Sequence, residues 1–181
     1  MSPKPFVIKP ADRKTALNVL GTRVTVLAAG GDSSDQRITL QSGSEGTGPP
    51  PHSHDWDESF YVSGGHIQFT CGGETSMCAA GTFVHIPAST VHSFSYGPGG
   101  GELIEITGRR SHAVEMFEAL ADAIPPGPLD VAKAIQVWGT TASRFTSRGW
   151  RADEVAGASA PCSKCEAGEA DQHHCPSGRL R

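Results

Sequence analysis

The chain has 181 residues, including 22 glycines and 13 prolines, and a formal net charge of −4 at pH 7. This length suffices for one domain with a core of its own, and the glycine and proline content favours many turns between short strands. There is no block of lysines or arginines, so we expect neither nucleic acid nor a membrane surface as a partner. The first residues, MSPKPFVIKP, hold prolines and charges where a secretory signal needs an apolar run, so we expect a cytoplasmic protein.

Between residues 6 and 107, short apolar or alternating runs are separated by turn clusters such as SGG and GPGGG. The runs are FVI, TRVTVLAA, QRITLQ, ESFYV, HIQFTC, TFVHIP, HSFSY and ELIEIT. Runs of this length and spacing predict an all-β fold, an antiparallel sandwich or barrel. Cys71 and Cys78 lie in these runs and are expected to be free, buried thiols, because no export signal points to a disulfide framework.

After residue 112 the apolar period changes from two to three or four. Val114, Phe117 and Leu120 mark one face of a helix, with Ser111 as its cap and Pro125 as its end. A second amphipathic stripe predicts another short helix over residues 130–139. We therefore expect an N-terminal arm at 1–20, a barrel at 21–110, helices at 111–140 and a disordered tail at 141–181.

The tail contains three cysteines and two adjacent histidines. Cys162, Cys165, His173 and Cys175, with His174 as a second histidine, could bind zinc tetrahedrally. The adjacent last two ligands do not match the spacing of a zinc knuckle, so incidental cysteines in a disordered tail are the other interpretation.

The stretch PPPHSHDWDE contains the strongest chemical signal in the sequence. Three prolines cannot lie inside a helix or a central strand, so His52 begins the element that follows. If a strand continues through DWD, His52, His54 and Glu58 face one side, because side chains alternate along a strand. Two imidazoles and a carboxylate suit one divalent transition metal, Fe, Mn, Co, Ni, Cu or Zn.

A fourth ligand has to come from another strand. His92 follows a proline-containing turn, as His52 does, and is therefore the preferred candidate. His66, His85 and His112 have no partner at a supporting spacing, so we interpret them as structural or surface residues.

These residues resemble the cupin superfamily. Gly46, His52, His54, Glu58 and Gly65 match every fixed position of the first cupin motif. The second motif is met by Gly81, Pro87 and His92, while Ser89 and Tyr96 replace its glycine and its asparagine. The resemblance implies a jelly-roll β-barrel with short C-terminal helices that holds a metal through His52, His54, Glu58 and His92. It also implies a homodimer formed through terminal strands, a role that FVIKP could serve.

The helical stretch after residue 107 is similar to that of single-domain cupins of the quercetin 2,3-dioxygenase type. This similarity implies a metal-dependent dioxygenase that combines O₂ with a small aromatic or enolisable substrate. The metal-bound Glu58 would move a proton, and the Tyr96 hydroxyl could reach the substrate. The alternatives are a non-redox cyclase or isomerase, in which the metal acts as a Lewis acid, and a non-catalytic cupin that binds a small molecule.

The walls of the expected substrate pocket are apolar. Phe60 and Val62 share the parity of Glu58, Phe94 shares that of His92, and Phe69 completes the set. The same residues would serve equally well as the core of any barrel.

Overall fold

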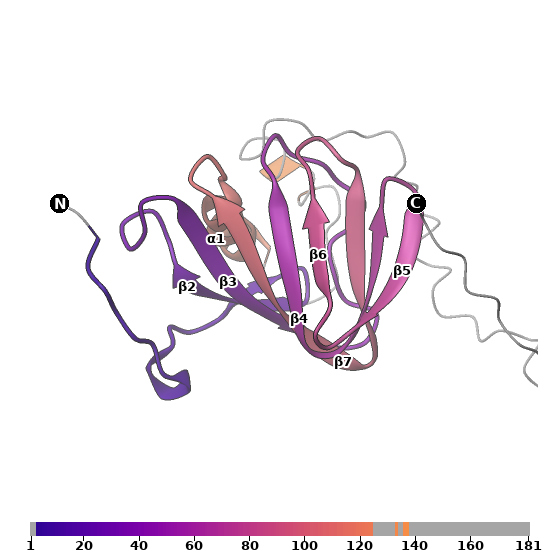
Figure 1. Ribbon diagram of the computed structural model, residues 1–181, viewed down its shortest axis with the longest axis horizontal. Helices are drawn as coiled ribbons and strands as arrows, with labels where there is room; N and C mark the ends of the chain where they lie inside the picture. The colour runs from indigo at the N-terminus through magenta and orange to yellow at the C-terminus, as the bar shows by residue number, and fades with distance from the viewer. Residues whose placement is uncertain (1–2, 125–132, 134–135, 138–181) are drawn as a thin grey trace, which may run out of the picture. The chain divides into compact units, whose positions relative to one another are not determined.

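The computed structural model describes residues 3–124, 133 and 136–137 (Figure 1). Within them lie a short 3₁₀ helix, seven strands and one α-helix. In chain order these are η1 (Pro10–Asp12), β1 (Leu17–Val19), β2 (Thr22–Ala28), β3 (Gln36–Gly43), β4 (Glu58–Cys71), β5 (Glu74–Ala79), β6 (Phe83–Ile86), β7 (His92–Gly108) and α1 (Ala113–Ala123). The expected all-β class with helical structure after the strands is confirmed.

All strands belong to one antiparallel sheet. Its order is β1-β2-β3-β7-β4-β5, and β6 also pairs with β4. β7 occupies the middle, because its second half pairs with β3 from Gly101 to Gly108 and with the first half of β4. Its first half pairs with the second half of β4, down to the pair Cys71 and His92.

The ladder formed by β4 and β7 folds back on itself. Glu58 and Cys71 are the two ends of β4, and a straight strand of this length would hold its ends more than about 40 Å apart. His92 pairs with Cys71, yet its side chain lies 3.1 Å from that of Glu58. The ladder therefore bends, and its register shifts around Gly64 and Gly65 mark the place.

This bend explains where the sequence analysis was wrong. The clusters SGG and GPGGG are not turns between strands, because Gly65 pairs with Gly101 inside the continuous ladder. Runs expected to be separate strands are therefore halves of β4 and of β7.

The sequence analysis also missed two strands, β1 and the polar β5, and the run FVI at residues 6–8 is not a strand.

Two apolar clusters form the core. The strand core lies among β4–β7 and consists of Phe60, Val62, Ile67, Phe69, Cys78, Ile86, Phe94, Tyr96 and Leu103. The helix-side core joins α1 to β1 and β2 and consists of Val19, Val24, Trp56, Ala113, Met116, Phe117, Leu120 and Ile124. The predicted apolar face of α1 is therefore buried, and Ser111 accepts a hydrogen bond from the N–H of Ala113 at 3.0 Å.

Several expectations concern residues that the structure describes only in part. Of the second predicted helix, Lys133, Gln136 and Val137 are described, and they are helical. The expected tail and the cysteines predicted to bind zinc lie outside the described residues.

Cys71 and Cys78 are free thiols, half-buried and buried respectively. Among the described residues, no helix has the length and apolar character needed to cross a membrane.

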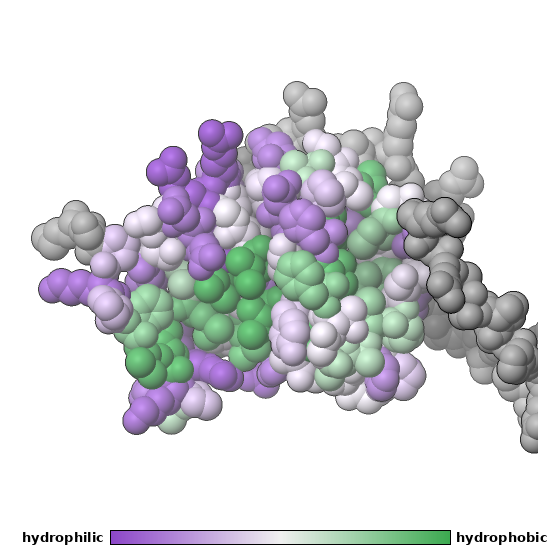
Figure 2. Space-filling view, viewed as in Figure 1, coloured by the Kyte–Doolittle hydropathy of each residue, from purple (hydrophilic) through white to green (hydrophobic). Residues whose placement is uncertain are grey.

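Some large apolar side chains remain exposed. They include Phe6 and Val7 in the N-terminal segment and Tyr61 and Phe83, which are paired between β4 and β6. Figure 2 shows apolar side chains gathered on one face of the molecule. The homodimer stays a prediction.

The bend of the ladder should depend on Gly65. Its φ is +69°, and an added Cβ would meet the carbonyl oxygen of Gly100 and come within 2.8 Å of the Cα of Gly101. Both neighbours are backbone atoms that cannot move aside. Gly65→Ala should therefore lower the free energy of unfolding, measured by urea denaturation, by more than about 2 kcal/mol.

Two other glycines separate the effect of the left-handed backbone from the effect of the close backbone approach. Gly72 has a φ of +59° but open space around its Cα, so Gly72→Ala should cost only the left-handed backbone, about 1 kcal/mol. A Cβ added at Gly64 would lie 3.7 Å from the Cβ of Glu102, which is an ordinary contact. Gly64→Ala should therefore cost less stability than Gly65→Ala or Gly72→Ala. Equal effects of Gly65→Ala and Gly72→Ala would show that the close approach of the two strands is unimportant.

Candidate metal centre

The four predicted metal ligands come from two segments of the chain, residues 52–58 and the start of β7. His52 forms an isolated bridge with His92, the first residue of β7, and each of the two donates its backbone N–H to the carbonyl of the other. Glu58 is the first residue of β4, and His54 lies in the loop between. The expected strand through DWD does not form, so alternation along a strand is not what aligns His52, His54 and Glu58.

Hydrogen bonds to a neighbouring loop hold the 53–57 segment instead. Ser89 donates its N–H to the carbonyl of His54 at 2.7 Å, and Ala88 donates its N–H to the carboxylate of Asp57 at 2.8 Å. The imidazole of His54 also stacks on Trp56, with ring centroids 4.3 Å apart and planes 3° from parallel. Trp56 in turn belongs to the helix-side core, so the position of His54 depends on the packing of α1.

Ser89 adopts a backbone conformation that favours glycine. Its φ is +66°, and it stands where the cupin motif has glycine. The sequence comparison thus marked a real constraint on the turn, which serine meets at some conformational cost.

The four side chains converge at one buried point. One ligand atom from each of His52, His54, Glu58 and His92 lies within 4.8 Å of those of the other three, and all four residues are buried. The two carboxylate oxygens of Glu58 are 2.9 Å from Nε2 of His54 and 3.1 Å from Nε2 of His92. The fold thus brings together the whole predicted set.

The backbone fixes which nitrogen of each histidine faces the centre. Every ring places Nδ1 near a backbone carbonyl two residues away. The pairs are His52 with Pro50 at 2.8 Å, His54 with Trp56 at 2.8 Å, and His92 with Thr90 at 2.9 Å. A carbonyl oxygen only accepts, so Nδ1 carries the proton, and in the neutral ring the lone pair is on Nε2. This arrangement presents Nε2 as the ligand atom.

Burial keeps the site in the charge state that a cation requires. Burial, followed by the neighbouring His92, lowers the pKa of His52 from 6.5 to about 3, so its ring stays neutral. Burial alone would raise the pKa of Glu58, but the contacts of its carboxylate with the side chains of His54 and then His92 outweigh burial and hold the pKa well below its ordinary value. Glu58 is therefore ionised at neutral pH.

These groups fit a divalent transition metal. Nε2 of His54 and of His92 are buried, and the groups beside them are the oxygens of the Glu58 carboxylate, which cannot donate a hydrogen bond to a lone pair. Lone pairs and a carboxylate that converge in a buried space have lost their contacts with water, and a bound cation would stabilise them. Fe, Mn, Co, Ni, Cu and Zn accept three imidazoles and one carboxylate as ligands.

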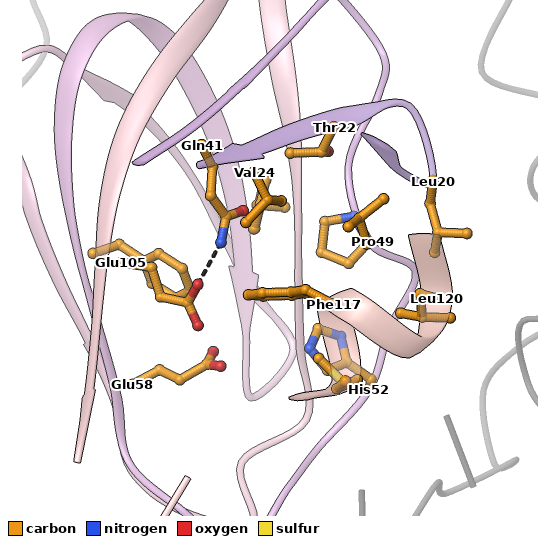
Figure 3. Close-up of a pocket in the computed structure, with 14 residues that line it drawn as sticks. Leu20, Thr22, Val24, Gln41, Pro49, His52, Glu58, Glu105, Phe117 and Leu120 are labelled. Atoms are coloured by element: carbon orange, nitrogen blue, oxygen red, sulfur yellow. Dashed lines mark hydrogen bonds between the residues drawn. The ribbon is translucent and has the colours of Figure 1, made fainter. Parts of the chain in front are cut away.

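A pocket opens beside the four side chains, between the two cores (Figure 3). His52 and Glu58 line it together with residues of β1–β3 and of α1, including Met116, Phe117 and Leu120. The space that the centre of a water molecule can reach is about 40 Å³, which is room for a few water molecules. Side chains of α1 would have to move to admit a larger ligand.

The predicted pocket residues divide into two groups. Phe60 and Phe94 line the pocket, whereas Val62, Phe69 and Tyr96 lie in the strand core and are absent from the lining. Tyr96 is buried beside Thr22. Burial raises the pKa of its phenol above the ordinary value, and the charges of Glu105 and Glu102 add to this effect.

The sequence analysis missed a second carboxyl group in the pocket. Glu105 of β7 is buried and accepts hydrogen bonds from Thr39 and Gln41 of β3. Burial and the nearby charge of Glu58 raise the pKa of Glu105 well above its ordinary value. Leu103, Glu105 and Thr107 are all buried, so an acidic residue at an inward position of the run ELIEIT was the available signal.

The other histidines of the described residues lie outside the cluster. The sequence analysis interpreted His66, His85 and His112 as structural or surface residues, and all three are exposed. Nδ1 of His85 is 2.9 Å from the hydroxyl of Ser59. None belongs to the four-residue cluster.

Comparison with known families bears on the segment that carries this site. Residues 37–114 match the family described as Cupin domain. This segment is a cupin domain. The resemblance seen in the two motifs is therefore confirmed.

A curated relative gives a more specific similarity. Quercetin 2,3-dioxygenase of Bacillus subtilis (strain 168) is 31% identical over 93 residues, which cover 50% of this chain and 27% of the relative. The chain thus spans about a quarter of the length of that relative.

Solved structures show the same fold at low sequence identity. The polyketide cyclase RemF of Streptomyces resistomycificus has a TM-score of 0.53 at 21% identity, with 59% of this chain and 81% of that one covered. KdgF of Halomonas sp. has a TM-score of 0.56 at 17% identity, with 61% and 99% covered. An RmlC-like cupin of Shewanella frigidimarina has 0.55 at 17%, with 63% and 99% covered. The cupin fold is thus shown by structure as well as by sequence.

Removal of one imidazole should weaken metal binding. His54→Ala deletes a predicted ligand, so the affinity for Zn(II) or Co(II), measured by competition with a chromophoric chelator, should fall more than about tenfold. His85→Ala is the matched control, because it removes a strand histidine outside the cluster. Equal affinities of the two variants would contradict the assignment of His54.

The metal-free protein should lose stability as pH falls from 6.5 towards 3. His52 stays neutral in the folded protein, whereas the unfolded chain takes up a proton below its ordinary pKa of 6.5, so protonation favours unfolding in this window. Glu58, with its lowered pKa, adds to the loss below about pH 4.5. Urea midpoints between pH 6.5 and 4.5 should therefore depend on pH less steeply in His52→Asn than in the wild type. The exposed control His66→Asn should keep the wild-type slope, and an unchanged slope in His52→Asn would contradict the burial of a neutral ring.

Proposed function

We propose that this protein is a metal-dependent cupin enzyme, a dioxygenase that acts on a small aromatic or enolisable compound. The observation that carries the proposal is the convergence of three imidazoles and one carboxylate beside a largely apolar pocket. The similarity to quercetin 2,3-dioxygenase supports the choice of reaction class.

The metal would be held by His52, His54, Glu58 and His92. When bound, it supplies Lewis-acid polarisation of a substrate oxygen and a position for O₂. The Nδ1–H bonds to backbone carbonyls keep the three rings oriented, so little reorganisation is needed when a ligand enters.

Glu58 has a second role in this proposal. One of its oxygens is sufficient for a metal, and the other remains available at the pocket wall to take a proton from an enolisable substrate. Phe60 and Phe94 offer apolar ring faces at the same wall. Phe117 and Leu120 of α1 add apolar side chains to the pocket lining.

The cavity size favours small substrates. About 40 Å³ holds a few water molecules, so a multi-ring flavonol would require displacement of α1 side chains. A panel of test substrates should therefore begin with small β-diketones and catechols and extend to flavonols.

Oxygen uptake by reconstituted protein tests the proposal. Metal-depleted protein is loaded in turn with Fe(II), Mn(II), Co(II), Ni(II), Cu(II) or Zn(II) and mixed with each substrate in an oxygen electrode. We expect uptake that requires both a metal and a substrate. Glu58→Gln should lower the rate at least about 100-fold while three imidazoles still retain metal. His85→Ala should leave the rate unchanged.

Other outcomes lead to other conclusions. Full activity of Glu58→Gln with every metal would exclude proton transfer by Glu58. Tight metal binding without oxygen uptake would favour a non-redox cyclase or isomerase, which would use the same ligands with the metal as a Lewis acid.

A further inference from the structure

The pocket has a second polar wall, made by residues other than the metal ligands. Thr39 and Gln41 of β3 and Glu105 of β7 form it, and all three are buried. Thr39 and Glu105 are direct partners in the β3–β7 ladder, while Gln41 and Glu105 line the pocket. Figure 3 shows the Glu105 carboxyl group between Gln41 and Glu58, directed into the pocket.

The two oxygens of Glu105 have different surroundings. Oε2 accepts a hydrogen bond from the Thr39 hydroxyl at 2.8 Å and another from the Gln41 amide. Gln41 also contacts the Thr39 hydroxyl at 3.2 Å, so the three side chains hold one another in place. Oε1 is buried and has no hydrogen-bond partner among the described residues.

The contacts of Oε2 hold Glu105 in place, and Oε1 is the oxygen left at the pocket wall. Buried polar atoms in proteins are nearly always hydrogen-bonded, and one left open at a pocket wall is available to a ligand. Glu58 is the neighbouring carboxylate. It cannot donate a hydrogen bond to Oε1, although it can accept one from Glu105 when Glu105 is protonated. The fixed Oε2 orients Oε1 towards the space beside the metal site, as a specific contact requires.

We propose that Glu105 is a substrate-binding residue that holds a hydroxyl group of a small ligand whose other oxygens occupy the metal site. A hydroxyl group suits this position because it can donate to a carboxylate or accept from a carboxylic acid. Because Glu105 lies close to Glu58, this hydroxyl group would be next to the ligand oxygens that occupy the metal site. The ligand class is therefore a small chelating compound with an adjacent hydroxyl group. The inference rests on the proposed metal site, but not on dioxygenase activity.

Two small chelators that differ by one hydroxyl group test the inference. Acetohydroxamate offers two oxygens to a metal, and glycolohydroxamate adds a hydroxyl on the neighbouring carbon. Both are titrated into the full-length, Zn(II)-loaded protein by isothermal titration calorimetry. The wild type should bind glycolohydroxamate about tenfold more tightly, the effect of one hydrogen bond to a buried carboxyl group. In Glu105→Met the two affinities should become equal.

Matched variants separate ligand contact from structural support. Thr39→Val keeps the Glu105 carboxyl group but removes one of its supports, so it should retain the preference for glycolohydroxamate. Glu105→Gln keeps a polar group at the wall and should retain a preference of several-fold. The zinc affinity and the melting temperature of each variant are measured first, so that a change in the metal site or the fold is recognised.

The possible failures are distinguishable. A wild-type protein that binds zinc but shows equal affinity for the two chelators, or no affinity for either, would overturn the inference. So would a Glu105→Met variant that keeps the wild-type preference, and the wild-type comparison alone decides the matter if this variant does not fold. A wild type that fails to bind zinc or any other tested metal would overturn the proposed function and this inference with it.

Discussion

The fold-back of the β4–β7 ladder is the constraint on which the rest of this structure depends. Glu58 and His92 lie at opposite ends of that ladder in pairing order, yet their side chains are in contact. Only the bend near Gly65 and Gly101, where the two backbones approach too closely for a Cβ, makes this possible. The pocket beside these side chains is lined by residues of both the strand core and the helix-side core.

The candidate metal centre is a buried group of acceptors held by the backbone. Three carbonyl oxygens fix the Nδ1 protons, which leaves the Nε2 lone pairs directed at a shared centre. Such a group is costly to bury without a cation, because each lone pair and the carboxylate have lost their contacts with water. The stacking of His54 on Trp56 links this centre to α1, so the helix both covers the pocket and supports one of its ligands.

The pocket combines two polar walls with apolar surroundings. The ligand cluster lies at one wall, and Glu105 with Gln41 and Thr39 lies at the other. A site of this kind recognises a ligand through a few fixed polar contacts, while the apolar residues decide its size. The proposed reaction class is supported by a similarity to quercetin 2,3-dioxygenase that covers about a quarter of that relative. Within that proposal, the narrow cavity of this chain favours ligands smaller than a flavonol.

The sequence by itself determined the fold class, the helix at 113–123 and the identity of the four clustered residues. The strand-rich class and the helix follow from alternation and apolar period, and the four residues follow from the fixed spacings of the two cupin motifs that the sequence resembles. It did not determine that SGG and GPGGG lie inside long strands, because glycine signals a turn and a strand bend equally well. Nor did it reveal the alignment of His54 by hydrogen bonds from another loop, or the meeting of Glu105 with Thr39 and Gln41. Those features depend on which strands become neighbours, and strand pairing between distant residues is decided only by the tertiary structure.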